Sequence, residues 1–324
     1  MFEEWGLLGN TMILLVSLFI LDRASDLMVD NAVKVAGISG LGKTTVGFLL
    51  IAMSTTLPEL SVSVFASIDG KGIGVAIGNA LGSNVVNSGL ILGIAFLIAS
   101  LRSPKDVKDP NTVAKEELGT LHFGLFIASV IPLVLLFIGA VSRIIGLALI
   151  GIFILHVYRL SRTKRMSGEW IDWKNRKRLR VYALLVFIGA IMVVASARLL
   201  VDSVVNIAAS LGVPGVVIGA TIVAFGTSLP EFVNSVKSSR RGHLDLAMGN
   251  IVGSNFIDTT LILGVALVGS PFSVEMNHFR NLVIFSLAAN LLLWYFILSE
   301  RISWKTGVIL FIVYILFLAT SISI

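Results

Sequence analysis

The chain has 324 residues, of which 56% are hydrophobic and 14% are charged, and its mean hydropathy is +0.94. Soluble globular domains are rarely so apolar, and the long apolar runs do not alternate as the strands of an outer-membrane barrel do. The composition therefore predicts an all-α polytopic membrane protein. The net charge of +6 does not indicate nucleic-acid binding, because the basic residues lie in loops between apolar runs, where they indicate topology.

Ten apolar runs are long enough to be membrane spans, which need about 20 residues each. The first follows MFEEWG, which lacks the basic start of a secretory signal peptide, so we interpret it as a retained span. The predicted spans are 7–29, 45–67, 73–101, 120–139, 143–159, 181–208, 214–238, 245–269, 280–298 and 304–322. A polar stretch, residues 158–180, contains nine Lys or Arg residues and separates five spans from five. We therefore divide the chain into a first five-helix repeat (1–160), a cytoplasmic basic connector (161–180) and a second five-helix repeat (181–324).

The distribution of basic residues predicts the orientation of these spans. If the N-terminus lies outside, the inside loops hold twenty Lys or Arg residues and the outside loops hold three. The positive-inside rule then places both termini outside the cell. We expect a multi-pass protein of the cell membrane, surrounded by lipid.

The two halves of the sequence resemble each other. At a shift of 172 residues, VGFLLIAMSTTLPELSVSVFA (46–66) aligns with IGATIVAFGTSLPEFVNSVKS (218–238), and eight of 21 positions are identical. At a shift of 171 residues, GNALGSNVVNSGLILGIA (78–95) aligns with GNIVGSNFIDTTLILGVA (249–266), and ten of 18 positions are identical. This identity indicates an internal duplication. Because each copy has five spans, the copies must have opposite orientations, and such inverted repeats are typical of alternating-access transporters with a site at the repeat interface.

A proline followed by a glutamate interrupts the second and the seventh predicted span. Pro58 lacks an N–H and its ring clashes with the carbonyl of Ser54. Pro230 also lacks an N–H, and its ring clashes with the carbonyl of Gly226. We expect each helix to break there and to leave carbonyls around 52–55 and 224–227 unpaired. Unpaired carbonyls are costly within a membrane unless something binds them.

A carboxylate follows each proline, Glu59 in the first half and Glu231 in the second. Thr55 and Thr227 lie four residues earlier and share a helix face with the glutamates if the helix resumes locally. Each motif therefore offers a carboxylate, hydroxyls and free carbonyls, which are hard oxygen ligands suited to Ca²⁺ or Na⁺. Inserting a carboxylate at the centre of a membrane helix costs about 2.5–3.5 kcal/mol. The chain carries this cost twice, at corresponding positions of its two halves, and a bound cation would explain why.

A second pair of motifs places polar side chains on one face of a helix, at intervals of four residues. These residues are Asn79, Ser83 and Asn87 in the first half and Asn250, Ser254 and Asp258 in the second. The glycines of the same motifs, among them Gly78 and Gly82, permit close helix approach. The repeat predicts one pocket lined by the two Glu, Asp258 and asparagine side chains, with several hydroxyls and carbonyls. Structural pairing of each Glu with a basic side chain is the alternative, and the absence of Arg and Lys from the interior of these spans weighs against it.

TTLPE with GNALGSNVVN, and GTSLPE with GNIVGSNFID, resemble the two α-repeats of the cation/Ca²⁺ antiporter superfamily, and the closest resemblance is to its prokaryotic sodium/calcium exchanger branch. The resemblance implies a bundle of ten helices in which spans 2, 3, 7 and 8 form the site and the long spans 1 and 6 slide against them. It also implies a secondary active antiporter that exchanges Ca²⁺ for Na⁺. We expect no prosthetic group, no nucleic-acid partner and no obligate protein partner.

Carried over by motif position, the resemblance implies a set of ion ligands in this sequence. Glu59 and Glu231 would bind a central Ca²⁺, to which Thr55 and Thr227 would add carbonyl oxygens. The central region would be completed by Asn87 and Asp258. Flanking Na⁺ sites would receive hydroxyl or carbonyl oxygens from Thr56, Ser228, Ser83, Ser254, Ala52 and Ala224.

Differences between the two copies bear on the transported ions. The first motif reads STT where the second reads GTS, so extra bulk could tighten or reshape one flanking site. Asn87 corresponds to Asp258, and an acid at this place also occurs in the potassium-dependent branch and could bind a proton. A proton- or potassium-coupled Ca²⁺ exchanger of the same fold is therefore the alternative prediction. Both second motifs read GSN, whereas the proton-coupled branch typically carries an acidic GNxxE-type motif, which argues against proton coupling.

Two other classes of protein compete with a transporter. A passive Ca²⁺ channel is not excluded by inverted repeats with broken helices. An enzyme is the least favoured prediction, because the sequence shows no nucleophile–base arrangement and its four histidines lie near predicted span ends, apart from both motifs.

Overall fold

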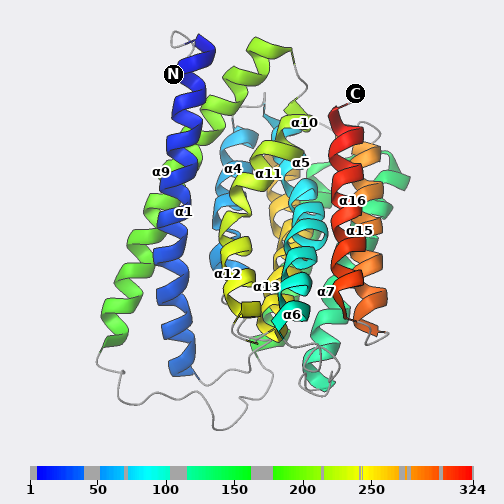
Figure 1. Cartoon of the computed structure of the whole chain (residues 1–324). Coiled ribbons are helices and arrows are strands. Elements are labelled where there is room, and N and C mark those ends of the chain that lie inside the picture. The colour runs from blue at the N-terminus through cyan, green and yellow to red at the C-terminus, as the bar shows by residue number, and fades with distance from the viewer. Residues whose placement is uncertain are drawn as a thin grey trace.

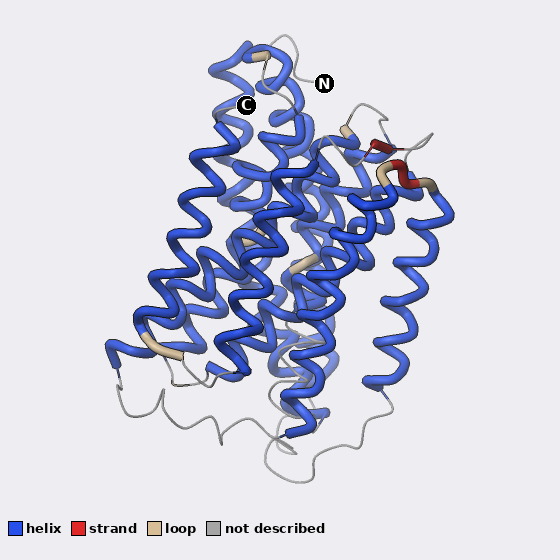
Figure 2. The backbone as a smooth tube through the Cα atoms, turned by 90° about the vertical axis from the view of Figure 1, so that its right-hand side faces the viewer, coloured by secondary structure: helices blue, strands red, loops and turns tan. Residues whose placement is uncertain are grey.

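A computed structural model describes residues 6–39, 52–68, 72–102, 115–161, 178–212, 215–240, 242, 244–269, 274–275, 279–298 and 302–322. Within these ranges the protein is a bundle of helices joined by turns and one short β-ladder (Figures 1 and 2). The longest helices are α1 (Gly6–Ser39) and α9 (Leu179–Leu211). At about 1.5 Å per residue, each exceeds a hydrocarbon core of about 30 Å. They pack along each other at one side of the bundle (Figure 1).

The other helical elements follow the predicted spans closely. In chain order they are α3 (Ala52–Thr55), α4 (Leu57–Ile68), α5 (Ile73–Val85), η3 (Val86–Ile91), α6 (Leu92–Arg102), α7 (Lys115–Ile138), α8 (Arg143–Ser161), α10 (Gly215–Ile218), η7 (Gly219–Val223), α11 (Ala224–Thr227), α12 (Leu229–Arg240), α13 (Leu244–Ile257), η8 (Asp258–Ile262), α14 (Leu263–Gly269), α15 (Arg280–Leu298) and α16 (Trp304–Ile322). The label η marks π-helical segments. Each predicted span contains helix, although residues 45–51 and 214 lie outside the described residues. The predicted connector, 161–180, also lies mostly outside them.

Length and composition alone identify fewer membrane spans than ten in the described part of the chain. Five helical segments are long and apolar enough, namely Gly6–Ala24, Ile73–Leu101, Ala247–Gly269, Arg280–Leu298 and Trp304–Ser321. A sixth is added if the bent pair Gly215–Thr227 and Leu229–Arg240 counts as one span. The protein is thus helical and membrane-like, and the ten-span layout stays a prediction.

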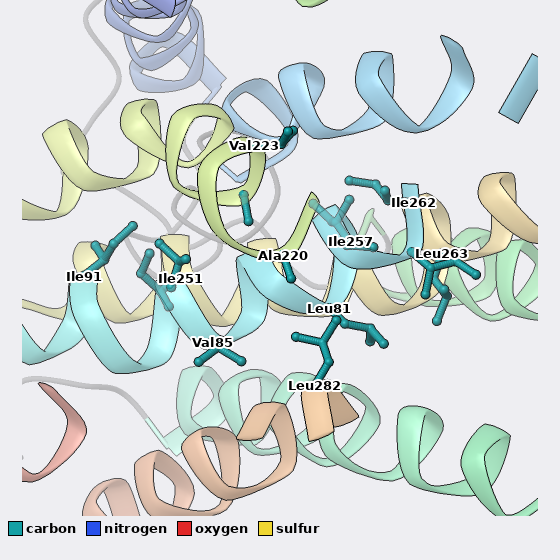
Figure 3. Packing of buried hydrophobic residues seen from close by; sticks show 14 of the residues in the cluster. Leu81, Val85, Ile91, Ala220, Val223, Ile251, Ile257, Ile262, Leu263 and Leu282 are labelled. Atoms are coloured by element: carbon teal, nitrogen blue, oxygen red, sulfur yellow. The ribbon is translucent and has the colours of Figure 1, made fainter. Parts of the chain in front are cut away.

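Two helical stacks, α5–η3–α6 and α13–η8–α14, form the centre of the bundle and are largely buried, except toward the end of α6. The elements η7 and α15 pack against α5. Figure 3 shows apolar side chains of these elements gathered in one cluster that includes Leu81, Val85, Ala220, Ile251, Ile257 and Leu282. By contrast, α1 and α9 expose large apolar side chains, as helices that face lipid do.

A short β-ladder ties together connections from the two halves of the chain. β1 (Ala140–Val141), between α7 and α8, pairs antiparallel with β2 (Val274–Glu275), between α14 and α15. No strand is predicted from the sequence here, because two residues are too few for an alternating pattern to be recognised.

Glycines allow α5 to approach α10 and η7 very closely. A Cβ atom added to Gly78 would lie 2.5 Å from the Val216 carbonyl oxygen, and one added to Gly82 would lie 2.6 Å from the Ala220 Cα atom. No ordinary side chain fits at such distances without a shift of backbone. The predicted role of these two glycines in close helix approach is confirmed.

We expect Gly82→Ala to lower the melting temperature of the purified protein in detergent. The added methyl group overpacks a contact between two backbones, which typically costs about 1–3 kcal/mol. Thermal unfolding followed by tryptophan fluorescence measures the effect. Gly151→Ala on α8 is the matched control, because no atom lies within 4 Å of its added Cβ. Equal melting temperatures for the two variants would show that the α5–η7 contact relaxes freely.

Candidate functional site

Two helices are interrupted at the same point of the repeated motif. A single residue separates α3 from α4 and α11 from α12, namely Thr56 in the first half and Ser228 in the second. Pro58 and Pro230 each take the second position of the following helix, where the missing N–H has no helical partner to lose. The helical segments on either side of Ser228 are bent by 43°. The predicted breaks are confirmed.

The carbonyl groups at these breaks are less free than predicted. The N–H of Thr56 donates to the Ala52 carbonyl at 2.9 Å, and the N–H of Ser228 donates to the Ala224 carbonyl at 3.1 Å. The Thr56 hydroxyl also donates to the Ala52 carbonyl, at 2.8 Å. The prediction of unpaired carbonyls is therefore wrong for Ala52 and Ala224, because each turn residue keeps its own helical hydrogen bond. Either oxygen could bind a cation only in addition to these donors.

The two glutamates lie at the start of the helices that follow the breaks. Glu59 and Glu231 are in the first turns of α4 and α12, and each is at most 1% exposed. A helix N-terminus favours a negative charge. The Ser228 hydroxyl donates to Glu59 Oε1 at 3.2 Å, and the Ser254 hydroxyl donates to Glu231 Oε1 at 3.3 Å. The Oε2 atom of each glutamate has no hydrogen-bond partner, which is costly for a buried charged group.

Reciprocal hydrogen bonds join the motifs of the two halves. The Thr227 hydroxyl donates to Asn79 Oδ1 at 3.0 Å, and the Thr55 hydroxyl donates to Asn250 Oδ1 at 3.4 Å. Under the sequence shifts of the repeat, these two pairs correspond to each other. The Ser228 contact with Glu59 also crosses between the halves. The expectation that the repeated motifs meet in one place is confirmed by these contacts.

Two further polar residues of the motifs lie in π-helical segments, which often occur at functional sites. Asn87 belongs to η3 and Asp258 begins η8. Asn87 Nδ2 donates to Asn255 Oδ1 at 3.1 Å, and Asn87 Oδ1 has no hydrogen-bond partner. Neither oxygen of Asp258 has a partner, nor does the hydroxyl of Ser83. The π-helical turns are not predicted from the sequence.

The buried charges have no counter-charge nearby in sequence. Glu59, Glu231 and Asp258 lie close enough to interact electrostatically. In the described part of the chain, the motif-bearing helices have basic residues only toward their ends, and these are Arg102, Lys237 and Arg240. No three His, Cys, Asp or Glu side chains among the described residues are arranged to hold a metal ion by themselves. A cation here therefore requires amide, hydroxyl or carbonyl oxygens besides carboxylates, which suits Ca²⁺ or Na⁺.

All twelve predicted ligand residues are buried, on α3, α4, α5, η3, α11, α12, α13, η8 and the two turn residues. Their role as ion ligands stays a prediction. Four buried polar residues around them were missed from the sequence: Asn84, Ser88, Asn255 and Asn290. The identical GSN of both copies was an available signal for Asn84 and Asn255, whereas Asn290 lies outside the repeated motifs.

Two of the four histidines pack among aromatic rings. The His156 ring centroid lies 4.6 Å from that of Phe256 and 4.8 Å from that of Phe123. The ring centroids of His122 and Trp294 are 6.5 Å apart. Because Phe256 belongs to the second motif, His156 lies nearer to that motif than expected, although its contact there is with an apolar ring.

The similarities of the chain to known proteins agree with this geometry. The sequence matches the family described as sodium/calcium exchanger protein over residues 9–162 and 181–323. It is 32% identical over 359 residues to the sodium/calcium exchanger MaX1 of Methanosarcina acetivorans, an alignment that covers 95% of this chain and 97% of that protein. It is also 33% identical over 140 residues to sodium/potassium/calcium exchanger 5 of Homo sapiens, covering 41% of this chain and 27% of that protein.

The fold is similar to that of a solved exchanger. The structure of the sodium-calcium exchanger NCX_Mj, soaked with 2.5 mM Na⁺ and 0.1 mM Ca²⁺, superimposes with a TM-score of 0.70 and 28% sequence identity. The superposition covers 96% of this chain and 98% of that one. Together with the family match over nearly the whole sequence, this shows that the chain belongs to the sodium/calcium exchanger protein family.

Proposed function

We propose that this chain is a secondary active antiporter that exchanges Ca²⁺ for Na⁺ across the cell membrane by alternating access. The observation that carries the proposal is the pair of buried glutamates at the helix breaks, each with one oxygen that has no hydrogen-bond partner. A cation bound between them would supply the missing partner. Membership of the sodium/calcium exchanger family supports the same function.

We assign the ligand roles by motif position. Glu59 and Glu231 bind Ca²⁺ directly, and the carbonyls of Thr55 and Thr227 complete its shell together with Asn87 and Asp258. The flanking Na⁺ sites are formed by Thr56, Ser228, Ser83, Ser254, Ala52 and Ala224. Burial of all these residues supports the assignment. The Ala224 carbonyl would serve through the lone pair that its backbone donor leaves available, whereas the Ala52 carbonyl would serve only after the Thr56 hydroxyl turned away from it.

Charge balance explains why the two ions exclude each other. When Asp258 is protonated, the two glutamates neutralise one Ca²⁺, and adding Na⁺ to the loaded pocket would give it excess positive charge in a medium of low dielectric constant. The pocket therefore holds either Ca²⁺ or several Na⁺ ions. Na⁺ running inward then drives Ca²⁺ outward.

The long helices α1 and α9 are the proposed gate. They pack along each other, and both contact motif-bearing elements, α1 with α3 and α12 and α9 with α4. The Asn206 amide donates to Asn10 Oδ1 at 3.1 Å and ties the two helices together. Moving the gate over an empty pocket would keep the carboxylates buried without a compensating cation, which is costly. Only the loaded pocket lets the gate slide.

For topology we propose ten spans in two inverted five-helix repeats, with both termini outside. Helix at each of the ten predicted ranges supports this layout. So does the placement of the start of α1 and the end of α16 at the same end of the bundle (Figure 1). The excess of basic residues in the alternate loops supports the orientation.

Coupling to K⁺ or H⁺ is the second candidate, and Asp258 is the observation that favours it. Its counterpart in the first half is the neutral Asn87, so the pocket carries one more acid than a symmetric pair of motifs needs. Both of its oxygens lack hydrogen-bond partners. Similarity over 140 residues to a sodium/potassium/calcium exchanger also keeps K⁺ in consideration.

We expect Glu59→Gln to abolish Ca²⁺ transport while leaving the protein folded, because the amide keeps the shape of the side chain and removes its charge. Uptake of ⁴⁵Ca²⁺ into proteoliposomes measures transport, and elution as a single species in size-exclusion chromatography measures folding. Asp30→Asn, which neutralises an exposed carboxylate on α1, is the control. Normal Ca²⁺ flux in Glu59→Gln would refute the site.

We expect ⁴⁵Ca²⁺ uptake to require an outward gradient of Na⁺. Vesicles loaded with Na⁺, K⁺ or acid are diluted into medium lacking each, because only the coupling ion can exchange for external Ca²⁺. If acid or K⁺ drives uptake instead, the proposed Ca²⁺ ligands are unaffected and Asp258 is the residue that selects the coupling ion. Asp258→Asn should then remove the requirement for acid or K⁺. Uptake without any counter-gradient would indicate a channel.

We expect the connector to face the cytoplasm and the N-terminus to face outward. The chain contains no cysteine, so single introduced cysteines report their side of the membrane. Glu4→Cys should react with a membrane-impermeant maleimide in intact cells, and Ser167→Cys should react only after the cells are permeabilised. The reverse pattern would invert the proposed topology.

A further inference from the structure

Behind the candidate site lies a buried network of amide and hydroxyl groups that the proposed ligands do not account for. It runs from the backbone of α7 through α15 and α13 to η3. Its side chains are Asn290, Asn255, Ser88 and Asn87, and each is at most 1% exposed. Every link has a defined donor and a defined acceptor, so the network has a direction.

The network begins at a proline inside α7. Pro132 has no N–H, so the carbonyl of Ala128, four residues earlier, lacks its usual helical donor. Asn290 Nδ2 donates to this carbonyl at 3.5 Å. Because a carbonyl can only accept, Asn290 must turn its NH₂ group toward α7 and its Oδ1 atom toward α13 and η3.

This orientation is passed on to the next amide. Asn290 Oδ1 accepts from Asn255 Nδ2 and from the Ser88 hydroxyl, each at 2.8 Å. Asn255 Nδ2 also donates to Ser88 Oγ at 2.7 Å. Both hydrogens of the Asn255 amide are therefore used on this side, and its Oδ1 faces the opposite way. There it accepts from Asn87 Nδ2 at 3.1 Å, which leaves Asn87 Oδ1 without a partner.

We propose that Asn290 is a positioning residue, which acts through Asn255 to fix the Asn87 amide with its oxygen, and not its NH₂ group, available to the transported cation. This inference rests on the proposed function, in which Asn87 contributes to the central cation region. A reversed Asn87 amide would present N–H donors to the cation and repel it. The network therefore holds the amide in the orientation that binds.

The second half of the chain shows why only one side needs this support. Asn84 corresponds to Asn255, and Asp258 corresponds to Asn87. Both polar atoms of the Asn84 amide and both oxygens of Asp258 lack hydrogen-bond partners. A carboxylate has two equivalent oxygens and offers an acceptor in either orientation, whereas an amide does so in only one.

The test is the Ca²⁺ dependence of Na⁺-driven ⁴⁵Ca²⁺ uptake by Asn290→Leu in proteoliposomes with matched amounts of protein. Loss of a group that orients a metal ligand typically costs tenfold or more in affinity, so we expect the KM for Ca²⁺ to rise about tenfold. Vmax should change less than about twofold, because the glutamates stay intact. In an Asn87→Ala background, Asn290→Leu should raise KM no further, because the amide that it orients is gone.

Two more variants keep the test decisive. Ser286→Ala on α15 is the matched control, because this buried hydroxyl has no hydrogen-bond partner, and the KM of this variant should equal that of the wild type.

Ser88→Ala removes one acceptor of the Asn255 amide with little change in volume, and it replaces Asn290→Leu in the test if that variant does not fold. We expect it to raise KM about threefold, in line with the loss of one hydrogen bond. If Asn87→Ala transports too slowly, the Ca²⁺-dependent rise in melting temperature in detergent provides the same comparison.

The outcomes separate this inference from the function on which it rests. A wild-type protein that transports no Ca²⁺ under any gradient overturns both. A wild-type protein that transports Ca²⁺, with unchanged KM in Asn290→Leu and Ser88→Ala, overturns only the inference. If the effects of Asn290→Leu and Asn87→Ala multiply, Asn290 acts independently of Asn87 and the inference is also overturned.

Discussion

The constraint on which the rest of this structure depends is buried negative charge with no basic residue in the described interior of the helices that carry it. Glu59, Glu231 and Asp258 are out of contact with water, and the described helices that carry them have basic residues only near their ends. The fold reduces this cost with two helix N-termini and two hydroxyl donors, Ser228 from the opposite half for Glu59 and Ser254 from the same half for Glu231. The oxygens left without partners are not compensated by the protein itself. Such a pocket is most stable when a cation occupies it, which makes occupancy part of the stability of the protein.

The helix breaks and the burial of the glutamates beside them could be predicted from the sequence because they depend on local covalent structure. The missing N–H of Pro58 disfavours a continuous helix, and a carboxylate beside it in an apolar run is costly in lipid and is therefore expected in the interior of the bundle. The sequence could not show that a one-residue turn at Thr56 would keep the Ala52 carbonyl paired, because this depends on backbone angles. Asn290 was beyond prediction for another reason. A single asparagine in an apolar helix forms no recognisable sequence motif. Its role becomes clear only from the structure, in which it donates to the Ala128 carbonyl that Pro132 leaves without a helical donor.

The repeated motifs of the two halves share the same helix breaks and π-helical turns but make different polar contacts. The Ser228 hydroxyl crosses to Glu59, whereas the corresponding Thr56 hydroxyl donates to its own backbone. Asn250 Nδ2 donates to Ser235 at 3.3 Å, whereas Asn79 Nδ2 has no partner. The two glutamates thus occupy corresponding positions, whereas Asp258 and the contacts of the neutral polar residues differ between the halves. In an antiporter that handles ions of different charge and size, such asymmetry lets one side of the pocket be rigid while the other adapts.

The two-residue ladder between β1 and β2 has a consequence for how the protein is made. β1 belongs to the first half of the chain and β2 to the second, so the ladder cannot form until α14 has left the ribosome and entered the membrane. Until then the connection between α7 and α8 carries backbone groups that have no strand to pair with, and water must satisfy them. The ladder can therefore close only late in biogenesis, and the contacts of α15 and α16 with the first half require a still longer chain.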